Sequence, residues 1–279
     1  IAYSTINRFL RGKGIHTPKT ISQHFNEGIM EIEDFGDNTL LHSIRKSKNI
    51  FPYYKKSINV ILKLQKIKPI NKIKIKLNRN LKLNNYNIKY LHKDSDLFLN
   101  WYLPGVLGKR KSKKFKKKIK IELNKLYKQI YFKNKFIVHR DFHVSNIMLV
   151  KSKLGIIDTQ DVILGNPMYD VASLIDDVRI QIPLTIKNKI FQYYIKKSSL
   201  RKNIYFLKND FDILSIQRNL KILGIFCRLD IRDKKTQYLK YLPYTWKLIE
   251  LRMKNKIFKN LEKILLDAVS KKLRKKKKF

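Results

Sequence analysis

The sequence predicts an α+β protein with a few short strands and a predominantly helical remainder. Residues 19–33 have the pattern of two strands joined by a turn at residues 26–28. Three short apolar runs follow one another between residues 136 and 157, separated by a polar loop and a polar turn, which is typical of short strands. Elsewhere apolar residues recur every three to four positions, as in residues 112–133, and this period indicates helices. Because the chain has 279 residues, we expect one domain or two lobes with enough chain to bury a core.

The composition limits the class of protein. No apolar run approaches the length of a membrane span, and the first residues lack the charged-then-apolar pattern of a secretory signal. Cys227 is the only cysteine, so an intramolecular disulfide is excluded, and its apolar surroundings in the sequence favour a packed thiol. We therefore expect a cytoplasmic protein without a membrane span.

The net charge of +42 is extreme and has two interpretations. The functional interpretation is that the chain binds nucleic acid or an anionic membrane. The lysines, however, are spread along the chain and stand between apolar positions, rather than forming one stripe with interleaved aromatic residues. A lysine-rich bias imposed by an AT-rich genome accounts better for this spread. We interpret the basic runs 109–120 and 271–278 as solvated faces or tails and expect no specific nucleic-acid partner.

The helical pattern occurs in segments that end at glycine, proline or polar connections. Gly12 and Gly14 follow the first helix, and Pro69 follows the helix over residues 51–66. Helices are expected over residues 1–12, from about residue 39, over 51–66, 91–107 and 112–133, from about residue 168, and over 186–198, 211–228, 238–253 and 257–272.

Three further segments are predicted to lack regular structure. Residues 34–37 form a polar linker after the first hairpin, residues 71–87 an irregular connection rich in lysine and asparagine, and residues 162–167 a loop. The aromatic residues at helical spacing in residues 91–107, Trp101 among them, indicate core packing more than a binding site.

The densest group of chemically useful side chains lies in residues 136–161. The loop after the first strand carries His139, Asp141 and Asn146, and the third strand ends at Asp158. A hairpin thus presents two aspartates and an asparagine at one end. This is the layout of a phosphoryl-transfer centre in kinase-type folds. There one Asp accepts the proton of the attacking hydroxyl, while an Asn and a second Asp hold Mg²⁺ against the phosphates of ATP. The structural alternative is a surface hairpin with a solvated polar loop.

Longer stretches of sequence around and beyond this hairpin resemble a known family. Residues 139–146 (HRDFHVSN) with Ile157 and Asp158 resemble the aminoglycoside phosphotransferase and choline kinase superfamily. One branch of it, the anomeric sugar kinases that phosphorylate N-acetylmuramate and N-acetylglucosamine in cell-wall recycling, is similar over several more segments. These are residues 31–37 (EIEDFGD), 101–108 (WYLPGVLG), 155–161 (GIIDTQD), 165–174 (GNPMYDVASL) and 217–226 (QRNLKILGIF). The likeness extends over essentially the whole chain and is weakest at residues 68–89.

The resemblance implies a protein-kinase-like fold of two lobes. Residues 1–37 would be the remainder of an incomplete N-lobe with its hinge, and residues 38–279 a mainly helical C-lobe. The family's first strands, with the phosphate-covering loop and the ATP-contacting lysine, would precede Ile1, so we expect this chain alone to be inactive. Thr159 departs from the family pattern, which has a packing aromatic residue there.

The resemblance also implies roles for individual residues. Asp141 would be catalytic, and Asn146 and Asp158 would bind the metal. The linker residues Glu33, Asp34 and Phe35 would contact ATP. In the loop, His139 and His143 would have supporting roles. Asp161 would lie beside the metal or cap the loop, and Asp170 would cap a helix or support the loop backbone. The residues around the sugar would be Trp101, Arg218 and Arg228.

The function expected from these observations is phosphorylation of a small-molecule sugar at its anomeric hydroxyl, with ATP and Mg²⁺ as cofactors. Two alternatives remain. One is a kinase of another small hydroxylated substrate of the choline, homoserine or aminoglycoside type, although an aminoglycoside site needs more acids than this chain carries. The other is a non-catalytic basic binding module on the same scaffold, against which Asp141, Asn146 and Asp158 all argue. The sequence does not indicate an oligomeric state.

Overall fold

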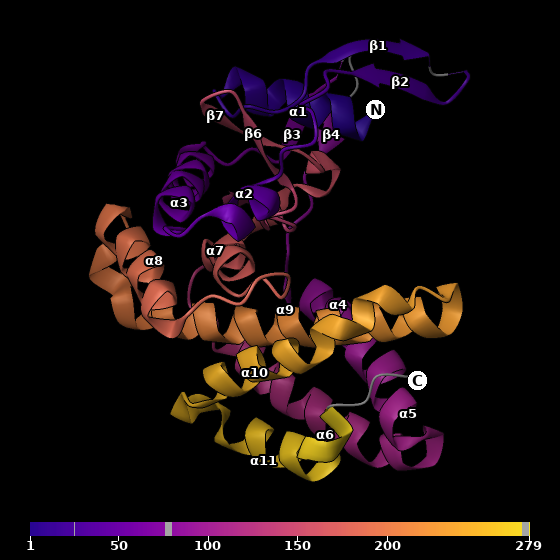
Figure 1. Ribbon diagram of the computed structural model, residues 1–279. Coiled ribbons are helices and arrows are strands. Elements are labelled where there is room, and N and C mark those ends of the chain that lie inside the picture. The colour runs from indigo at the N-terminus through magenta and orange to yellow at the C-terminus, as the bar shows by residue number, and fades with distance from the viewer. Residues whose placement is uncertain (25, 76–79, 275–278) are drawn as a thin grey trace. The chain divides into compact units, whose positions relative to one another are not determined.

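Figure 1 shows the computed structural model of the chain, which describes residues 1–24, 26–75, 80–274 and 279. The fold divides into two compact units. The first comprises Ile1–Asn85 and Lys133–Ile204, and the second comprises Tyr86–Phe132 and Tyr205–Phe279. The boundary predicted at residue 37 lies inside the first unit and stays a prediction. No helix among the described residues has the length and apolar character needed to cross a membrane.

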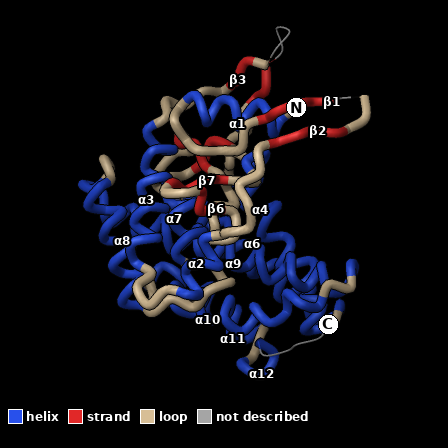
Figure 2. The backbone as a smooth tube through the Cα atoms, turned by 45° about the horizontal axis from the view of Figure 1, so that its top comes forward, coloured by secondary structure: helices blue, strands red, loops and turns tan. Residues whose placement is uncertain are grey.

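The first unit opens with the helix and the hairpin that the sequence predicts. α1 (Ala2–Gly12) buries one face, which includes Ile6 and Leu10. β1 (Thr20–His24) and β2 (Ile29–Ile32) pair antiparallel and extend away from α1 (Figure 2). All residues of β2 are exposed, so α1 rather than the hairpin supplies the core at this end of the unit.

α7 (Met168–Ile175), all of whose residues are buried, packs against α3 (Phe51–Lys66) and α8 (Leu184–Lys197). The first unit also contains α2 (Leu40–Lys46) and 3₁₀ turns at Thr159–Asp161 and Arg201–Asn203. Thr39 caps α2, because its side chain accepts a hydrogen bond of 3.2 Å from the backbone N–H of His42. α3 lies beside α8 in both views (Figures 1 and 2).

Two small antiparallel ladders carry the loop of residues 139–146. β6 (Ile147–Val150) pairs with β7 (Lys153–Ile156), with Ile147 opposite Ile156. β5 (Phe136–Val138) pairs with β8 (Ile163–Gly165). The three strands predicted between residues 136 and 157 are therefore confirmed, and the loop of residues 139–146 connects one ladder to the other.

Two segments predicted to be irregular form strands. The predicted loop 162–167 contains β8, because its apolar run supplies a partner for the exposed backbone edge of β5. The predicted connection 71–87 contains β3 (Lys72–Lys74) and β4 (Asn80–Lys82), which pair with Ile73 opposite Leu81. Ile73 is buried between exposed lysines, so the alternating Lys-Ile-Lys pattern is a strand period.

The second unit is helical. Its helices are α4 (Ile88–Leu97), α5 (Leu103–Leu107), α6 (Lys109–Lys128), α9 (Ile204–Asp233, whose first residue belongs to the first unit), α10 (Leu242–Met253), α11 (Lys259–Ala268) and α12 (Lys271–Arg274), with 3₁₀ turns at Thr236–Tyr241 and Lys256–Phe258. The single helix predicted over residues 91–107 is interrupted by a π-helical turn at Phe98–Tyr102. The basic run predicted at 271–278 is helical as far as Arg274, and its remainder lies outside the described residues.

Aromatic packing forms the core of the second unit, as predicted for residues 91–107. The rings of Phe98 and Tyr102 stack with their centroids 5.3 Å apart. Trp246 Nε1 donates a hydrogen bond of 2.7 Å to Tyr102 Oη, so the buried polar atoms of both rings are satisfied. Gly224 lets α9 approach α4, since a Cβ at this position would stand 2.2 Å from the carbonyl carbon of Leu97. Cys227 is buried, in agreement with the predicted packed thiol.

Candidate active site

The loop of residues 139–146 is held at its start by a buried carboxylate. Asp170, in the first turn of α7, accepts hydrogen bonds from the backbone N–H groups of His139 (2.8 Å) and Arg140 (3.0 Å). Arg140 has a positive φ of 73°, which a residue with a β-carbon adopts only when its surroundings hold it there. Asp170 therefore fixes the backbone immediately before Asp141.

His139 ties the loop to the end of the third strand. Its side chain is buried, and its Nε2 donates to the carbonyl oxygen of Ile157 at 3.0 Å. Burial lowers the pKa of His139 from its usual 6.5, while the negative charges of Asp141 and Asp158 oppose the shift. A neutral imidazole that donates to a backbone carbonyl supports the loop and holds Ile157, the residue before Asp158.

Asn146 and Asp158 meet in space. Asn146 Nδ2 lies 3.2 Å from Asp158 Oδ2 and 3.1 Å from the main-chain oxygen of Asp141, and donates to both. Asp158 adopts the left-handed conformation (φ 64°, ψ 42°) at the start of a 3₁₀ turn, Thr159–Asp161. Gln160 Nε2 donates to Asp158 Oδ1 at 2.6 Å. The structure thus brings the two predicted metal ligands together beside the backbone of the predicted catalytic aspartate.

The remaining predicted loop residues surround this pair. Asp141 is half-buried, and its main-chain oxygen also accepts from the backbone N–H of His143 at 2.9 Å. The side chain of His143 is buried, which is consistent with a supporting role in the loop. Asp161 is exposed and lies 3.7 Å from the guanidinium of Arg140.

The linker residues line the same cleft as Asn146 and Asp158. A hollow of about 730 Å³ is bounded by Glu33, Asp34, Phe35 and Gly36 on one side and by Asn146 and Asp158 on another. Its remaining walls are largely apolar and come from Tyr3, Pro18, Met30, Ile32, Met148 and Ile157. The cleft therefore has largely apolar walls and three carboxylates among its lining residues, those of Glu33, Asp34 and Asp158, and all of it belongs to the first unit.

The linker has a fixed shape. Glu33 accepts from the backbone N–H of Lys19 at 3.0 Å, and Asp34 accepts from the backbone N–H of Gly36 at 2.7 Å. Phe35 is buried against Gly155 of β7, where a Cβ would stand 2.5 Å from the ring. The absence of a side chain at Gly155 is what lets the phenyl ring anchor the linker to β7.

Among the residues that the structure describes, there is no group of three or more histidine, cysteine, aspartate or glutamate side chains arranged to hold a metal. The side chains of Asn146 and Asp158 offer two oxygens of the hard type. Such a sparse set fits Mg²⁺, which keeps several waters, and does not fit Zn²⁺ or Ca²⁺, which take most ligands from the protein.

Three predicted substrate residues belong to the second unit. Trp101 lies in the π-helical turn, and its carbonyl oxygen accepts from Cys227 Sγ at 3.3 Å. Arg218 is buried and Arg228 is half-buried, both on α9. Their roles stay predictions.

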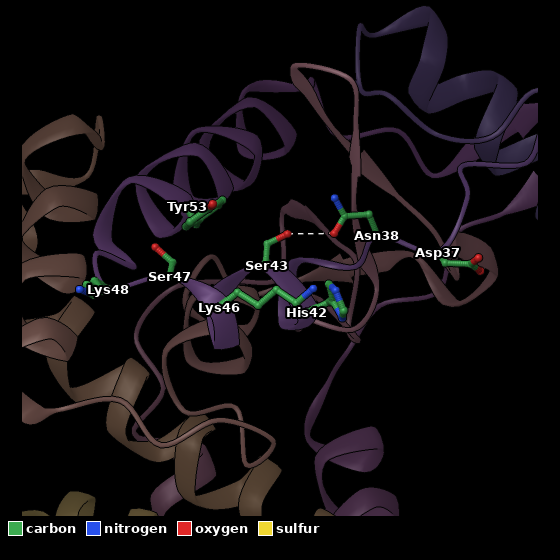
Figure 3. Close-up of a pocket in the computed structure, with 8 residues that line it drawn as sticks. All are labelled: Asp37, Asn38, His42, Ser43, Lys46, Ser47, Lys48 and Tyr53. Carbon is green, nitrogen blue, oxygen red and sulfur yellow. Dashed lines mark hydrogen bonds between the residues drawn. The ribbon is translucent and has the colours of Figure 1, made fainter.

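A second hollow of the first unit, about 800 Å³ in volume, follows the linker and contains none of the predicted residues (Figure 3). It is lined by Asp37, Asn38, His42, Ser43, Lys46, Ser47, Lys48 and Tyr53. Ser43 Oγ donates to Asn38 Oδ1 at 2.9 Å. The lining is mainly polar, and α2 supplies much of it. The backbone N–H of Leu41 in α2 donates to the carbonyl oxygen of Val144 at 3.0 Å, so α2 also borders the loop of residues 139–146.

Sequence reasoning missed one buried contact beside the site. Thr159, the residue after Asp158, donates through Oγ1 to Asn7 Oδ1 of α1 at 2.5 Å. Thr17 Oγ1 donates to the main-chain oxygen of the same Asn7 at 3.1 Å. The available signal was a polar residue, Asn7, among the apolar positions of an amphipathic helix, but its partner is 152 residues away in the sequence.

Comparisons with known sequences give a consistent result. The model of the phosphotransferase enzyme family matches residues 54–202. An N-acetylmuramate/N-acetylglucosamine kinase of Pseudomonas aeruginosa is 26% identical over 246 residues, which cover 86% of this chain and 70% of that protein.

Solved structures share the fold at low identity. A choline/ethanolamine kinase family protein from Mesorhizobium loti matches with a TM-score of 0.61 and 11% identity, over 95% of this chain and 82% of that one. An amicoumacin kinase in complex with AMP-PNP, Ca²⁺ and Ami matches with a TM-score of 0.56 and 13% identity, over 92% of this chain and 78% of that one. The α+β, protein-kinase-like fold expected from the sequence is thereby confirmed.

Proposed function

The chain belongs to the phosphotransferase enzyme family, and from that premise we propose that it transfers phosphate from ATP to the anomeric hydroxyl of N-acetylmuramate or N-acetylglucosamine. The family supports phosphoryl transfer to a small molecule. The choice of sugar is supported by the likeness to the kinase of Pseudomonas aeruginosa. It is also supported by residues 101–108 and 217–226, which resemble the anomeric kinases more than the wider superfamily.

One observation carries the proposal: the linker residues and the Asn146–Asp158 pair line a single cleft. We propose that adenine lies against the backbone of Glu33, Asp34 and Phe35, with the apolar walls around it, and that the phosphates reach Asn146 and Asp158. Residues 1–37 would then be the nucleotide-facing lobe with its hinge, and residues 38–279 the lobe that binds the sugar.

The cofactors of the proposed reaction are ATP and Mg²⁺. Asn146 and Asp158 would hold the metal, and Gln160 would orient the Asp158 carboxylate by its hydrogen bond to Oδ1. When bound, Mg²⁺ neutralises the charge of the phosphate oxygens. Asn146 contacts Asp158 through Nδ2, so its amide would have to turn to offer Oδ1 to an ion held by the Asp158 carboxylate.

Asp141 is the proposed catalytic residue. Phosphoryl transfer passes through a loose transition state, so catalysis consists mostly of positioning and charge neutralisation. Asp141 would orient the sugar hydroxyl and accept its proton as the new O–P bond forms. Its backbone is held from both sides, by Asp170 through the preceding N–H groups and by Asn146 through the Asp141 carbonyl.

The proposed sugar-binding residues rest on the family resemblance. Trp101, Arg218 and Arg228 are the residues that the family resemblance favours. The side chain of Arg218 is buried, and its Nη1 has no hydrogen-bond partner within the described part of the chain.

The product distinguishes this proposal from its alternatives. Phosphorus NMR of reactions of the full-length protein with ATP, Mg²⁺ and either sugar should show a glycosyl phosphate that couples to the anomeric proton and hydrolyses readily in acid. A stable 6-phosphate would show that the anomeric assignment is wrong. If the protein phosphorylated choline or an aminoglycoside well and neither of the two sugars, it would still be a kinase, but the proposed substrate would be wrong.

A further inference from the structure

α6 of the second unit is much richer in cations than the chain as a whole. Eleven of its twenty residues are lysine or arginine, and Glu122 is its one acid. The whole chain has 63 such cations in 279 residues, or fewer than one in four. A general lysine bias therefore does not account for the composition of this helix.

The cations of α6 all face solvent. The buried side of the helix consists of Ser112, Ile119, Leu123, Leu126 and Tyr127. All eleven cations are exposed, and at about 100° per residue they cover more than half of the helix circumference. Three of them contact polar side chains, namely Lys116 with Asn100, Lys120 with Asp96 and Lys125 with Glu122. The other eight have no polar side-chain partner among the described residues.

These charges oppose helix formation. Like charges three and four residues apart repel, and cations in the first turn oppose the positive end of the helix dipole. The first turn begins with Lys109, Arg110 and Lys111 and contains no acid, and the preceding residue, Gly108, provides no side-chain cap. The eight cations without a polar side-chain partner add repulsion and form no compensating contact in the described part of the chain, so an external anionic surface gives the better explanation.

We propose that the exposed face of α6 docks on the surface of an anionic lipid bilayer. Twenty helical residues form a rod about 30 Å long, which can lie along a plane of phosphates. The apolar side of α6 is used inside its own unit, as the neighbouring position of α11 illustrates (Figure 1), so the attachment is electrostatic and peripheral. It requires no membrane-spanning helix.

The same face is poorly suited to nucleic acid. Single strands are bound by exposed aromatic rings that stack on bases, and α6 has none, since Phe115 is half-buried and Tyr127 is buried. Base edges in duplex grooves are read mostly by arginine, asparagine and glutamine, whereas ten of the eleven cations are lysines.

The test compares two variants of equal charge. One carries Lys113→Gln, Lys114→Gln, Lys117→Gln and Lys118→Gln on α6. The control carries four substitutions at exposed lysines of the first unit, Lys189→Gln, Lys196→Gln, Lys197→Gln and Lys202→Gln. Glutamine keeps helix propensity, so both should retain the circular dichroism and thermal midpoint of the wild type. Binding is measured by co-sedimentation with vesicles of phosphatidylcholine alone or with about 30 mol% phosphatidylserine at about 0.1 M salt.

We expect the wild type and the control to bind the anionic vesicles, and the α6 variant to bind at least about thirtyfold more weakly, with no binding to neutral vesicles. Equal losses in the two variants would mean that net charge alone drives binding and would overturn the proposal. Retained binding by the α6 variant would do the same. Preference of the wild type for duplex or single-stranded DNA over anionic vesicles, lost in the α6 variant, would replace the bilayer with nucleic acid as the partner.

Discussion

Thr159 Oγ1 and Asn7 Oδ1 are joined by a hydrogen bond of 2.5 Å between two buried side chains. The bond fastens α1 to Thr159, the residue that follows Asp158. Asp158 itself has a left-handed backbone conformation, which depends on the surrounding contacts. A contact 152 residues apart in the sequence thus supports one of the two proposed metal ligands.

Thr159→Val should lower the free energy of unfolding by about 1–3 kcal/mol, because it leaves the buried Asn7 Oδ1 unpaired. Urea unfolding measures this loss. The double variant with Asn7→Leu removes both polar partners, so its loss should be smaller than the sum of the two single losses. Losses that add to within about 0.5 kcal/mol would show that the two residues are not coupled.

Asp141→Asn in the full-length protein should lower kcat by at least about a hundredfold, because an amide cannot accept the proton of the attacking hydroxyl. The affinity for ATP should change little, since Asp141 is not among the residues that line the cleft with the linker. Steady-state kinetics and calorimetry separate the two effects. Asp96→Asn, at a partly exposed surface ion pair with Lys120, is the control and should keep full activity. An Asp141→Asn enzyme with most of its activity would remove Asp141 from the catalytic role.

Asp158→Ala should abolish the Mg²⁺ dependence of ATP binding, because it removes the one carboxylate proposed as a metal ligand. Titration calorimetry with ATP, at several Mg²⁺ concentrations, gives the measurement. Asp161→Ala is the matched comparison, since Asp161 lies in the same 3₁₀ turn but faces Arg140. If ATP binding by Asp158→Ala kept its Mg²⁺ dependence, the metal would have to be held by other residues.

The parts of this fold that the sequence predicts are those encoded locally. The loop of residues 139–146 and its flanking strands follow from short apolar runs and the spacing of polar residues. β8 was missed because its three residues resemble an apolar loop until β5 offers an edge to pair with. β3 and β4 were missed because lysine alternation was attributed to composition.

The same difference between local and long-range signals applies to the candidate site. Asp141, Asn146 and Asp158 are recognisable from spacing, whereas the support from Asn7 and the packing of Phe35 on Gly155 depend on contacts between distant segments. The two-unit division also has no local signal, because each unit is assembled from two separate stretches of chain.

His139 makes the stability of the first unit depend on pH. Burial lowers the pKa of His139 from 6.5 in the folded protein, so below about pH 6.5 the unfolded chain binds a proton that the folded chain excludes. Stability from this residue is therefore present above pH 6.5 and is lost as the pH falls toward the folded-state pKa. Urea midpoints measured between about pH 8 and pH 5.5 should fall in the wild type.

His139→Asn should flatten this dependence, because the amide does not titrate and still offers an N–H to the carbonyl of Ile157. His24→Asn, at an exposed position of β1, serves as the control and should keep the wild-type slope. Parallel pH profiles for His139→Asn and the wild type would show that His139 is not the source of the effect.

Gly155→Ala tests whether the packing of Phe35 sets the shape of the nucleotide cleft. The new methyl group would stand 2.5 and 2.6 Å from two ring carbons of Phe35, closer than any real contact, and 3.1 Å from Val150 Cγ2. The ring cannot yield easily, because its other side packs on the imidazole of His16 at a centroid distance of 4.6 Å. Overpacking of this kind costs about 1–3 kcal/mol, and here it displaces the linker proposed to hold adenine.

We expect Gly155→Ala in the full-length protein to raise KM for ATP at least about fivefold, with a smaller change in kcat at saturation, because we propose that the linker binds ATP and that Asp141 performs the transfer. Gly12→Ala is the control, since nothing lies within 4 Å of a Cβ at that position. The double variant that combines Gly155→Ala with Phe35→Leu restores space for the methyl group and should recover much of the lost affinity. If Gly155→Ala and Gly12→Ala had the same KM for ATP, Phe35 would have no part in shaping the cleft. If the double variant bound ATP no better than Gly155→Ala alone, the methyl group would act through Val150 and β7 instead.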